Sequence, residues 1–180
     1  MHPPQLKIYN MFADLPKIDI KLTKNQQRQI AIGWIMIVIN FIIIGIFYTD
    51  LPDSIPAHFN YKGDVNGYGH KDSIWTLPII MALTYTLLFL IIKKVKPWNM
   101  NYPVKVTENN APRIYKMSLQ MLIYMNLLIS IIATPTIIET ILQAHEINLG
   151  FKISSLSIII VAIVTLLPLY YIFKMFKIPK

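Results

Sequence analysis

Residues 30–49 read IAIGWIMIVINFIIIGIFYT and contain no charged side chain. An α-helix rises 1.5 Å per residue, so a stretch of this length spans about 30 Å, the thickness of the hydrocarbon core of a bilayer. Three further apolar stretches follow at residues 74–92, 117–142 and 153–173. One buried helix of a soluble domain could be this apolar, but four could not. The sequence therefore predicts an all-α integral membrane protein with four transmembrane helices.

The composition supports this prediction. The chain has 180 residues, of which 54% are hydrophobic and only 14% are charged, whereas soluble domains carry about 25% charged residues. It contains no cysteine, which excludes a disulfide framework and thiolate chemistry. The formal net charge of +8 could suggest nucleic acid, but the basic residues are divided among separate segments and form no single stripe. We expect the lipid bilayer, and no nucleic acid, as partner.

The distribution of lysine and arginine predicts the orientation in the membrane. Five precede the first apolar stretch, six lie between the second and third, and three follow the fourth, whereas the two remaining connections hold two and one. Short cytoplasmic segments are enriched in lysine and arginine. We therefore expect a multi-pass protein of the cell membrane with both termini in the cytoplasm.

This orientation divides the chain into segments. The expected cytoplasmic parts are an N-terminal segment (1–29), a basic loop (93–116) and a tail (174–180). Residues 30–92 form a two-helix unit with an outer loop at 50–73, and residues 117–173 form the second pair of helices.

The outer loop has an unusual composition. Residues 51–71 read LPDSIPAHFNYKGDVNGYGHK and hold three of the six glycines of the chain. Prolines stiffen the exit from the first helix and glycines permit turns with positive φ, which predicts a compact cap. A plain connector of this length would not need such a composition, so we expect the loop also to bind a ligand. The residues that we expect to take part in this binding are His58, Asn60 and Lys71.

The loop resembles a family of bacterial membrane proteins defined by a small domain of unknown function, which is also found at the front of Sdp-type immunity proteins. The matching pattern, LPxxIPxHFNxxG followed by glycine and lysine, covers about 30 residues. Its positions are Leu51, Pro52, Ile55, Pro56, His58, Phe59, Asn60, Gly63, Gly69 and Lys71. Sdp-type immunity proteins carry a basic RPN…G…RTPW-like stretch in their second half, whereas this chain has KKVKPWNMNYPVK after its second apolar stretch.

The resemblance implies a non-enzymatic protein, immunity-like or sensor-like, that recognises a peptide or an envelope partner through the outer loop. We assign no catalytic residue, no metal ligand and no cofactor. Two alternatives stay open. The first is a small transporter or channel subunit. The second is a metal-dependent membrane enzyme using His58 and His70, although neither has the spacing of a preformed metal site.

Polar residues inside the apolar stretches are few. Asn40 lies near the middle of the first stretch and Asn126 near the middle of the third, while Glu139 is the only acid and lies near the outer end. An unpaired amide in hydrocarbon costs several kcal/mol. We therefore expect Asn40 and Asn126 to pack inward, close enough to pair or to share a threonine partner. A polar layer lining a substrate path is the functional alternative.

The orientation can be tested with reporter fusions. Fusions after Lys62 and at His145 should report an extracytoplasmic location, and fusions at Lys105 and after Lys180 a cytoplasmic one, because positive charge is retained on the cytoplasmic side. A cytoplasmic signal at Lys62 would contradict the predicted orientation.

Overall fold

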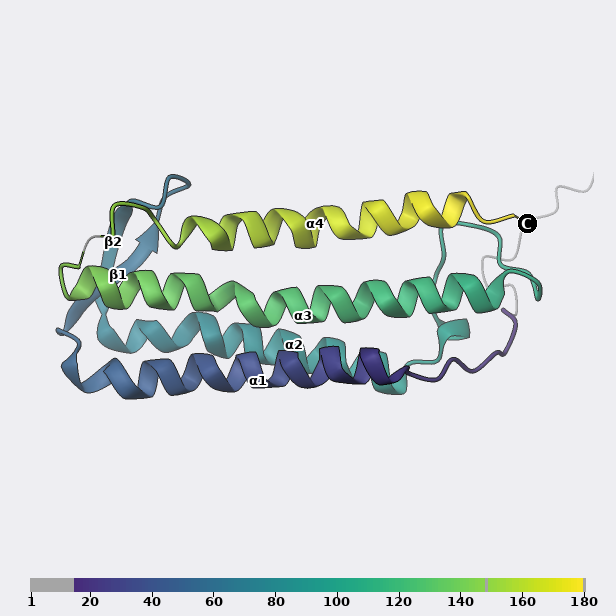
Figure 1. Cartoon of the computed structure of the whole chain (residues 1–180), viewed down its shortest axis with the longest axis horizontal. Helices are drawn as coiled ribbons and strands as arrows, with labels where there is room; N and C mark the ends of the chain where they lie inside the picture. Colours follow the sequence, from purple (N-terminus) through teal and green to yellow (C-terminus); the bar gives the residue numbers. More distant parts are fainter. Residues whose placement is uncertain (1–14, 148, 180) are drawn as a thin grey trace, which may run out of the picture.

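The computed structural model describes residues 15–147 and 149–179, so half of the expected N-terminal segment lies outside the described residues. Four long helices run side by side along the molecule, and a short β-hairpin lies across one end (Figure 1). The described N-terminal residues and the C-terminus lie at the opposite end. We name these two ends the hairpin end and the terminal end.

The helices are α1 (Lys24–Phe47), α2 (Thr76–Lys94), α3 (Ala111–Ala144) and α4 (Ser155–Phe176). Short 3₁₀ turns, η1 (Tyr48–Asp50), η2 (Lys71–Trp75) and η3 (Pro97–Asn99), lie in the connections between α1 and α3. Within the described chain, these four helices are long and apolar enough to cross a membrane, which confirms the predicted multi-pass membrane protein. Which end faces the cytoplasm stays a prediction.

Helix α1 begins six residues before the predicted apolar stretch. Thr23 caps it: the Thr23 hydroxyl accepts from the N–H of Gln26 at 3.2 Å, and the Gln26 side chain accepts from the N–H of Thr23 at 2.9 Å. This reciprocal capping box satisfies two main-chain donors, so the helix extends through a polar first turn that apolarity alone does not reveal.

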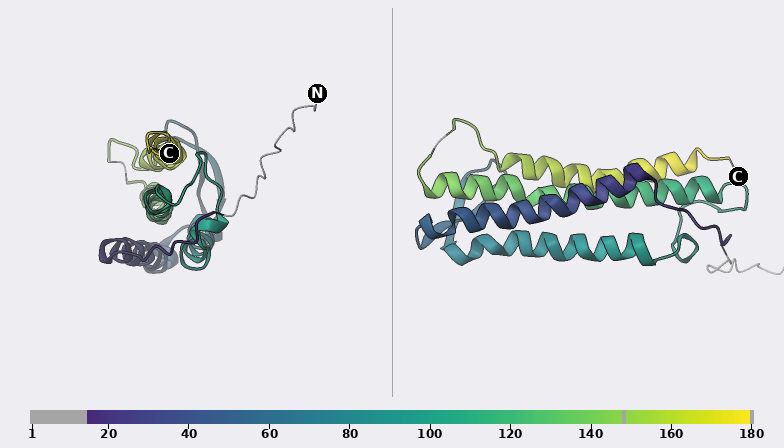
Figure 2. Two further views of the ribbon diagram at one scale, coloured as in Figure 1. Left: turned by 90° about the vertical axis from the view of Figure 1, so that its right-hand side faces the viewer. Right: turned by 60° about the horizontal axis from the view of Figure 1, so that its bottom comes forward.

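Helix α3 is the centre of the bundle. It packs against α1, α2 and α4, whereas α4 packs chiefly on α3. The end-on view shows α3 between α4 and the pair formed by α1 and α2 (Figure 2). With 34 residues, α3 is about 50 Å long, which exceeds the hydrocarbon core of a bilayer. It passes through Pro135 as one helix.

Buried apolar side chains gather along the bundle axis. At the hairpin end Ile44, Ile55 and Ile137 belong to one cluster, and in the middle Ile30, Ile92 and Ile123 form another. Large apolar side chains on the outer faces of the four helices are exposed. An apolar outside with an apolar inside is the pattern of helices that face lipid.

The terminal end has a cluster of its own, built around Tyr115 of α3 and Met175 of α4. Ile18 from the N-terminal segment and Tyr102 from the connection between α2 and α3 pack against it. The Tyr102 hydroxyl donates to the carbonyl of Pro97 at 2.8 Å, and burial raises the pKa of Tyr102 to about 12. The Tyr102 hydroxyl therefore keeps its proton at physiological pH and remains the donor of this hydrogen bond.

The expectation of an all-α chain is wrong at the outer loop. Strands β1 (Ser54–Phe59) and β2 (Val65–His70) form an antiparallel hairpin. Its register pairs Ser54 with His70 and Phe59 with Val65, with irregular pairing between Pro56 and Phe59. Proline is compatible with extended backbone at a sheet edge. The sequence suggested only a compact cap because its prolines and glycines obscure the alternation typical of strands.

The contact between α1 and α2 gives a prediction. A Cβ atom at Gly33 would lie 2.5 Å from the Tyr85 hydroxyl oxygen, and Tyr85 is fully buried and donates to the carbonyl of Ile30 at 2.7 Å. Overpacking of this kind costs about 1–3 kcal/mol, so Gly33→Ala should lower the thermal unfolding temperature of the purified protein in detergent.

Gly45→Ala is the matched control, because nothing lies within 4 Å of a Cβ atom at Gly45. Alanine is favoured over glycine in a helix by up to about 1 kcal/mol, so this variant should unfold at the parent temperature or above. Equal destabilisation by the two variants would contradict the proposed close approach of α1 and Tyr85.

Candidate ligand-binding cavity

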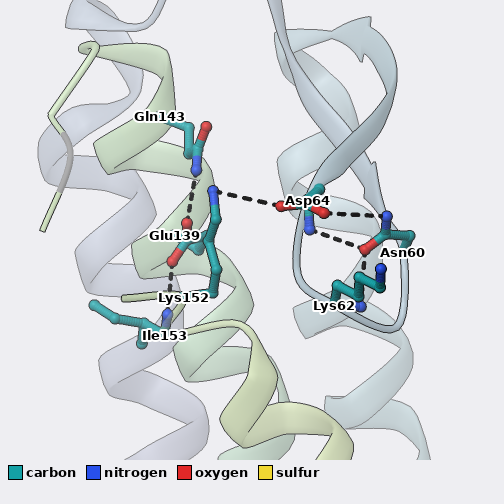
Figure 3. Close-up of polar contacts among 7 residues, drawn as sticks. All are labelled: Asn60, Lys62, Asp64, Glu139, Gln143, Lys152 and Ile153. Atoms are coloured by element: carbon teal, nitrogen blue, oxygen red, sulfur yellow. Dashed lines mark hydrogen bonds and ion pairs between the residues drawn. The ribbon is translucent and has the colours of Figure 1, made fainter. Parts of the chain in front are cut away.

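The turn of the hairpin is organised by Asn60. Its side-chain oxygen accepts from the N–H of Lys62 at 2.8 Å and from the N–H of Asp64 at 3.0 Å (Figure 3). The Asn60 main chain pairs with Asp64 and Gly63 as well. Gly63 has φ +80°, a conformation that favours glycine. Asn60 therefore shapes the turn with its carbonyl oxygen and leaves its amide nitrogen largely available.

The turn contacts the start of α4. A Cβ atom at Gly63 would lie 2.8 Å from the Cβ of Lys152 and 3.1 Å from the hydroxyl of Ser154, so only glycine permits this approach. The Lys152 ammonium also lies 3.9 Å from the Asp64 carboxylate (Figure 3). Two segments about 90 residues apart in the sequence are thereby brought together at the hairpin end.

A buried carboxylate holds the other side of this contact. Glu139, on α3, is only 4% exposed. One carboxylate oxygen accepts from the Gln143 side chain and the other from the N–H of Ile153, each at 2.8 Å (Figure 3). A carboxylate at a helix N-terminus satisfies a free donor and interacts favourably with the helix dipole. Glu139 thus determines where α4 starts on α3.

A cavity of about 220 Å³ lies between the hairpin, α3 and α4. The hairpin lines it with Ala57, His58, Phe59, Asn60 and Gly63, α3 with Thr136, and the start of α4 with Ser154, Ser157 and Ile158. Its walls therefore combine apolar side chains with hydroxyl, amide and imidazole groups, and none of these lining residues is an acid, lysine or arginine.

The hydroxyl groups of the cavity differ in how they are bonded. The Thr136 and Ser157 oxygens are 2.9 Å apart, and the Ser157 hydroxyl is also 2.8 Å from the carbonyl of Ile132. Ser154 is 5% exposed, and its hydroxyl has no hydrogen-bond partner among the described residues. A buried polar group left unpaired costs about 1–3 kcal/mol, and such groups are rare in native proteins. The Ser154 oxygen itself has almost no accessible surface, so this hydroxyl is enclosed beside the cavity and offers a ligand no contact.

The structure places the three predicted loop residues differently. His58 and Asn60 line the cavity, whereas Lys71 does not. The Lys71 ammonium lies 3.3 Å from the Asp53 carboxylate, and its main-chain N–H donates to the carbonyl of Asp53 at 3.0 Å. Lys71 thus fastens the base of the hairpin, so its position argues against a direct part in the cavity.

Sequence reasoning missed the hydroxyl side of the cavity. Thr136 lies in a TPT stretch of α3, and Ser154 and Ser157 lie at the start of α4. A signal was present in ISSLS, which puts three hydroxyls at the start of an otherwise apolar helix. Only the fold brings these residues to the hairpin.

The histidines of the hairpin have separate partners. The His58 ring nitrogen Nδ1 bonds the side-chain oxygen of Asn66, and the His70 Nδ1 lies 3.1 Å from the carboxylate of Asp72. Among the described residues, no three His, Cys, Asp or Glu side chains gather in a way that could hold a metal ion.

The two asparagines of the apolar stretches are both buried. The Asn40 amide donates to the carbonyl of Ser130 at 3.3 Å and accepts from the Thr134 hydroxyl at 2.7 Å. Asn126 is 1% exposed, yet both polar atoms of its side chain lack a hydrogen-bond partner in the part of the chain that the structure describes. Thus Asn40 has a threonine partner that Asn126 does not share, and the two amides do not pair with each other.

Four membrane-length helices and a hairpin over one end of the bundle define a multi-pass membrane protein. Residues 35–82 match a family model described as a domain of unknown function (DUF1648), which confirms the similarity to a family of that kind. The match spans most of α1, the hairpin and the start of α2, and it leaves out α3 and α4. Comparisons with curated proteins and with solved structures gave no significant match.

The difference between the asparagines gives a prediction. Asn40→Leu removes two hydrogen bonds between α1 and α3, and bonds of this kind are worth about 1 kcal/mol within membranes. Asn126→Leu removes an amide that has no partner, so it should leave stability unchanged or raise it. Thermal unfolding of both variants in the same detergent tests this order. Equal loss in the two variants would mean that Asn126 has a partner outside the described contacts.

Proposed function

We propose that the chain is a non-enzymatic protein of the cell membrane that recognises an extracytoplasmic ligand, a peptide or an envelope component, in the cavity under its hairpin. In this proposal the hairpin end faces outward and both termini are cytoplasmic. The bias of lysine and arginine supports the orientation: 14 of 17 lie in residues 1–29, 93–116 and 174–180. The role is immunity-like or sensor-like, as the resemblance of the loop implies.

One observation carries the proposal, namely a cavity that three separate elements form and that residues with hydroxyl, amide and imidazole groups line. A connector between α1 and α2 needs neither a contact with α4 nor a cavity there. The close approach at Gly63 and the ion pair between Lys152 and Asp64 hold the hairpin over the cavity. A concave site with a few convergent polar groups is the usual form of a binding site.

A small transporter or channel subunit is the second candidate. The observation in its favour is Asn126, whose buried amide is unpaired among the described residues and lies near the middle of α3. Polar groups inside the membrane often mark substrate pathways. Flux in proteoliposomes would support transport, and a binding protein predicts none.

The binding function can be tested in cells. His58→Ala removes the imidazole of a residue that lines the cavity, and His70→Ala makes the same change at a hairpin residue that does not line it. A host sensitive to secreted peptide toxins should be protected by the parent and by His70→Ala, at matched membrane levels, and much less by His58→Ala. Lys71→Ala should protect like the parent if it remains stably inserted.

Two results would count against this function. If the parent protects against none of the toxins tested, the immunity-like role fails. If His58→Ala and His70→Ala protect equally, protection does not depend on the cavity, and the hairpin is a structural cap.

A further inference from the structure

The size of the cavity limits what it can hold. Its volume is about 220 Å³. Sites for drug-sized molecules measure about 300–1,000 Å³. The cavity therefore holds a small group, either a small molecule or a short part of a longer ligand.

The hydrogen bonds already present decide what two of the polar residues can offer. Because the Ser157 hydroxyl donates to the carbonyl of Ile132, the hydroxyl of Thr136 is the donor in the contact between Thr136 and Ser157. The Thr136 oxygen then has lone pairs left, so it offers a ligand an acceptor.

Asn60 offers the opposite function. Its side-chain oxygen already accepts two main-chain N–H groups, and its amide nitrogen makes one long contact, 3.4 Å, with the Asp64 carboxylate. An amide nitrogen carries two N–H donors, so at least one remains for a ligand. The cavity thus has a donor on the hairpin side and an acceptor on the α3 side.

One further group completes this set. The His58 Nδ1 contacts the Asn66 side-chain oxygen. When Nδ1 carries the proton and donates to that oxygen, Nε2 of the neutral ring is an acceptor.

The charges around the cavity are already paired. Lys152 lies beside Asp64, and the Glu139 carboxylate accepts from Gln143 and from the N–H of Ile153 (Figure 3). An anion at the start of α4 would lie close to the negative charge of Glu139, which already accepts from the main-chain N–H of Ile153. A cation would find no carboxylate among the lining residues. Burying a charge without a partner is costly, so these surroundings favour an uncharged ligand.

We infer that the cavity binds an uncharged amide group, with its carbonyl and N–H side by side, that carries a small aliphatic substituent. The carbonyl accepts from Asn60, and the N–H donates to Thr136 or His58. The apolar walls formed by Ala57, Phe59 and Ile158 receive the substituent. This inference rests on the proposed function and specifies its ligand as a short uncharged peptide segment.

Four small probes of similar size test the inference by saturation-transfer NMR on the full chain in nanodiscs. They are N-acetylalanine methylamide, which is neutral, N-acetylalanine, an anion, alanine methylamide, a cation, and methyl glucoside, which is uncharged but has hydroxyls in place of amides. Each is measured on the parent, on Thr136→Val and on Thr165→Val, whose hydroxyl lies outside the cavity lining.

The neutral amide should bind the parent and Thr165→Val equally, and Thr136→Val about fivefold more weakly, the loss expected for one hydrogen bond. The other three probes should give no signal that depends on Thr136. If one of them gives the strongest Thr136-dependent signal, the ligand class is wrong and the proposed binding function stands. If no probe gives such a signal, the amide inference is overturned, and the protection assay then decides the proposed function separately.

Discussion

The hydrogen bond from the main chain of Ile153 to the buried carboxylate of Glu139 fixes the arrangement of the hairpin end. Helix α4 packs chiefly on α3, and most of its surface is apolar and exposed. Apolar side chains facing lipid do not specify position along a neighbouring helix, because lipid is as apolar as they are. The hydrogen bond between Ile153 and Glu139 is directional, so it specifies where the start of α4 lies along α3. The contact of Gly63 with Ser154, and hence the cavity, depends on that position.

The four helices could be predicted because each membrane crossing needs a long apolar run, and such runs are visible in one sequence. The hairpin could not be predicted in the same way. Its strands hold Pro56, Gly67 and Gly69, residues that are depleted in strands, and β1 packs on α3, a contact that the local sequence does not reveal. The start of α1 was missed by six residues because Thr23 and Gln26 extend the helix by capping.

Half of the candidate site was foreseeable and half was not. His58 and Asn60 belong to one short loop whose composition stands out, so a local argument reaches them. Thr136, Ser154 and Ser157 come from other helices, and their hydroxyls look like ordinary packing groups until the fold puts them opposite the hairpin. Lys71 belongs to the same local pattern as His58, but its ion pair with Asp53 turns it to the base of the hairpin. Proximity in sequence did not distinguish these two roles.

Helix α4 packs along α3 and is also held at both of its ends. At the terminal end Met175 is buried in a cluster with residues of α3, and the Asn110 side chain donates to the carbonyl of Pro179 at 3.3 Å. A helix of 22 residues adapts to a thinner or thicker bilayer by changing its tilt. Because the start of α4 forms one wall of the cavity, a change of tilt alters the width of that cavity. On the proposed function, lipid chain length in the surrounding membrane becomes a variable for ligand binding.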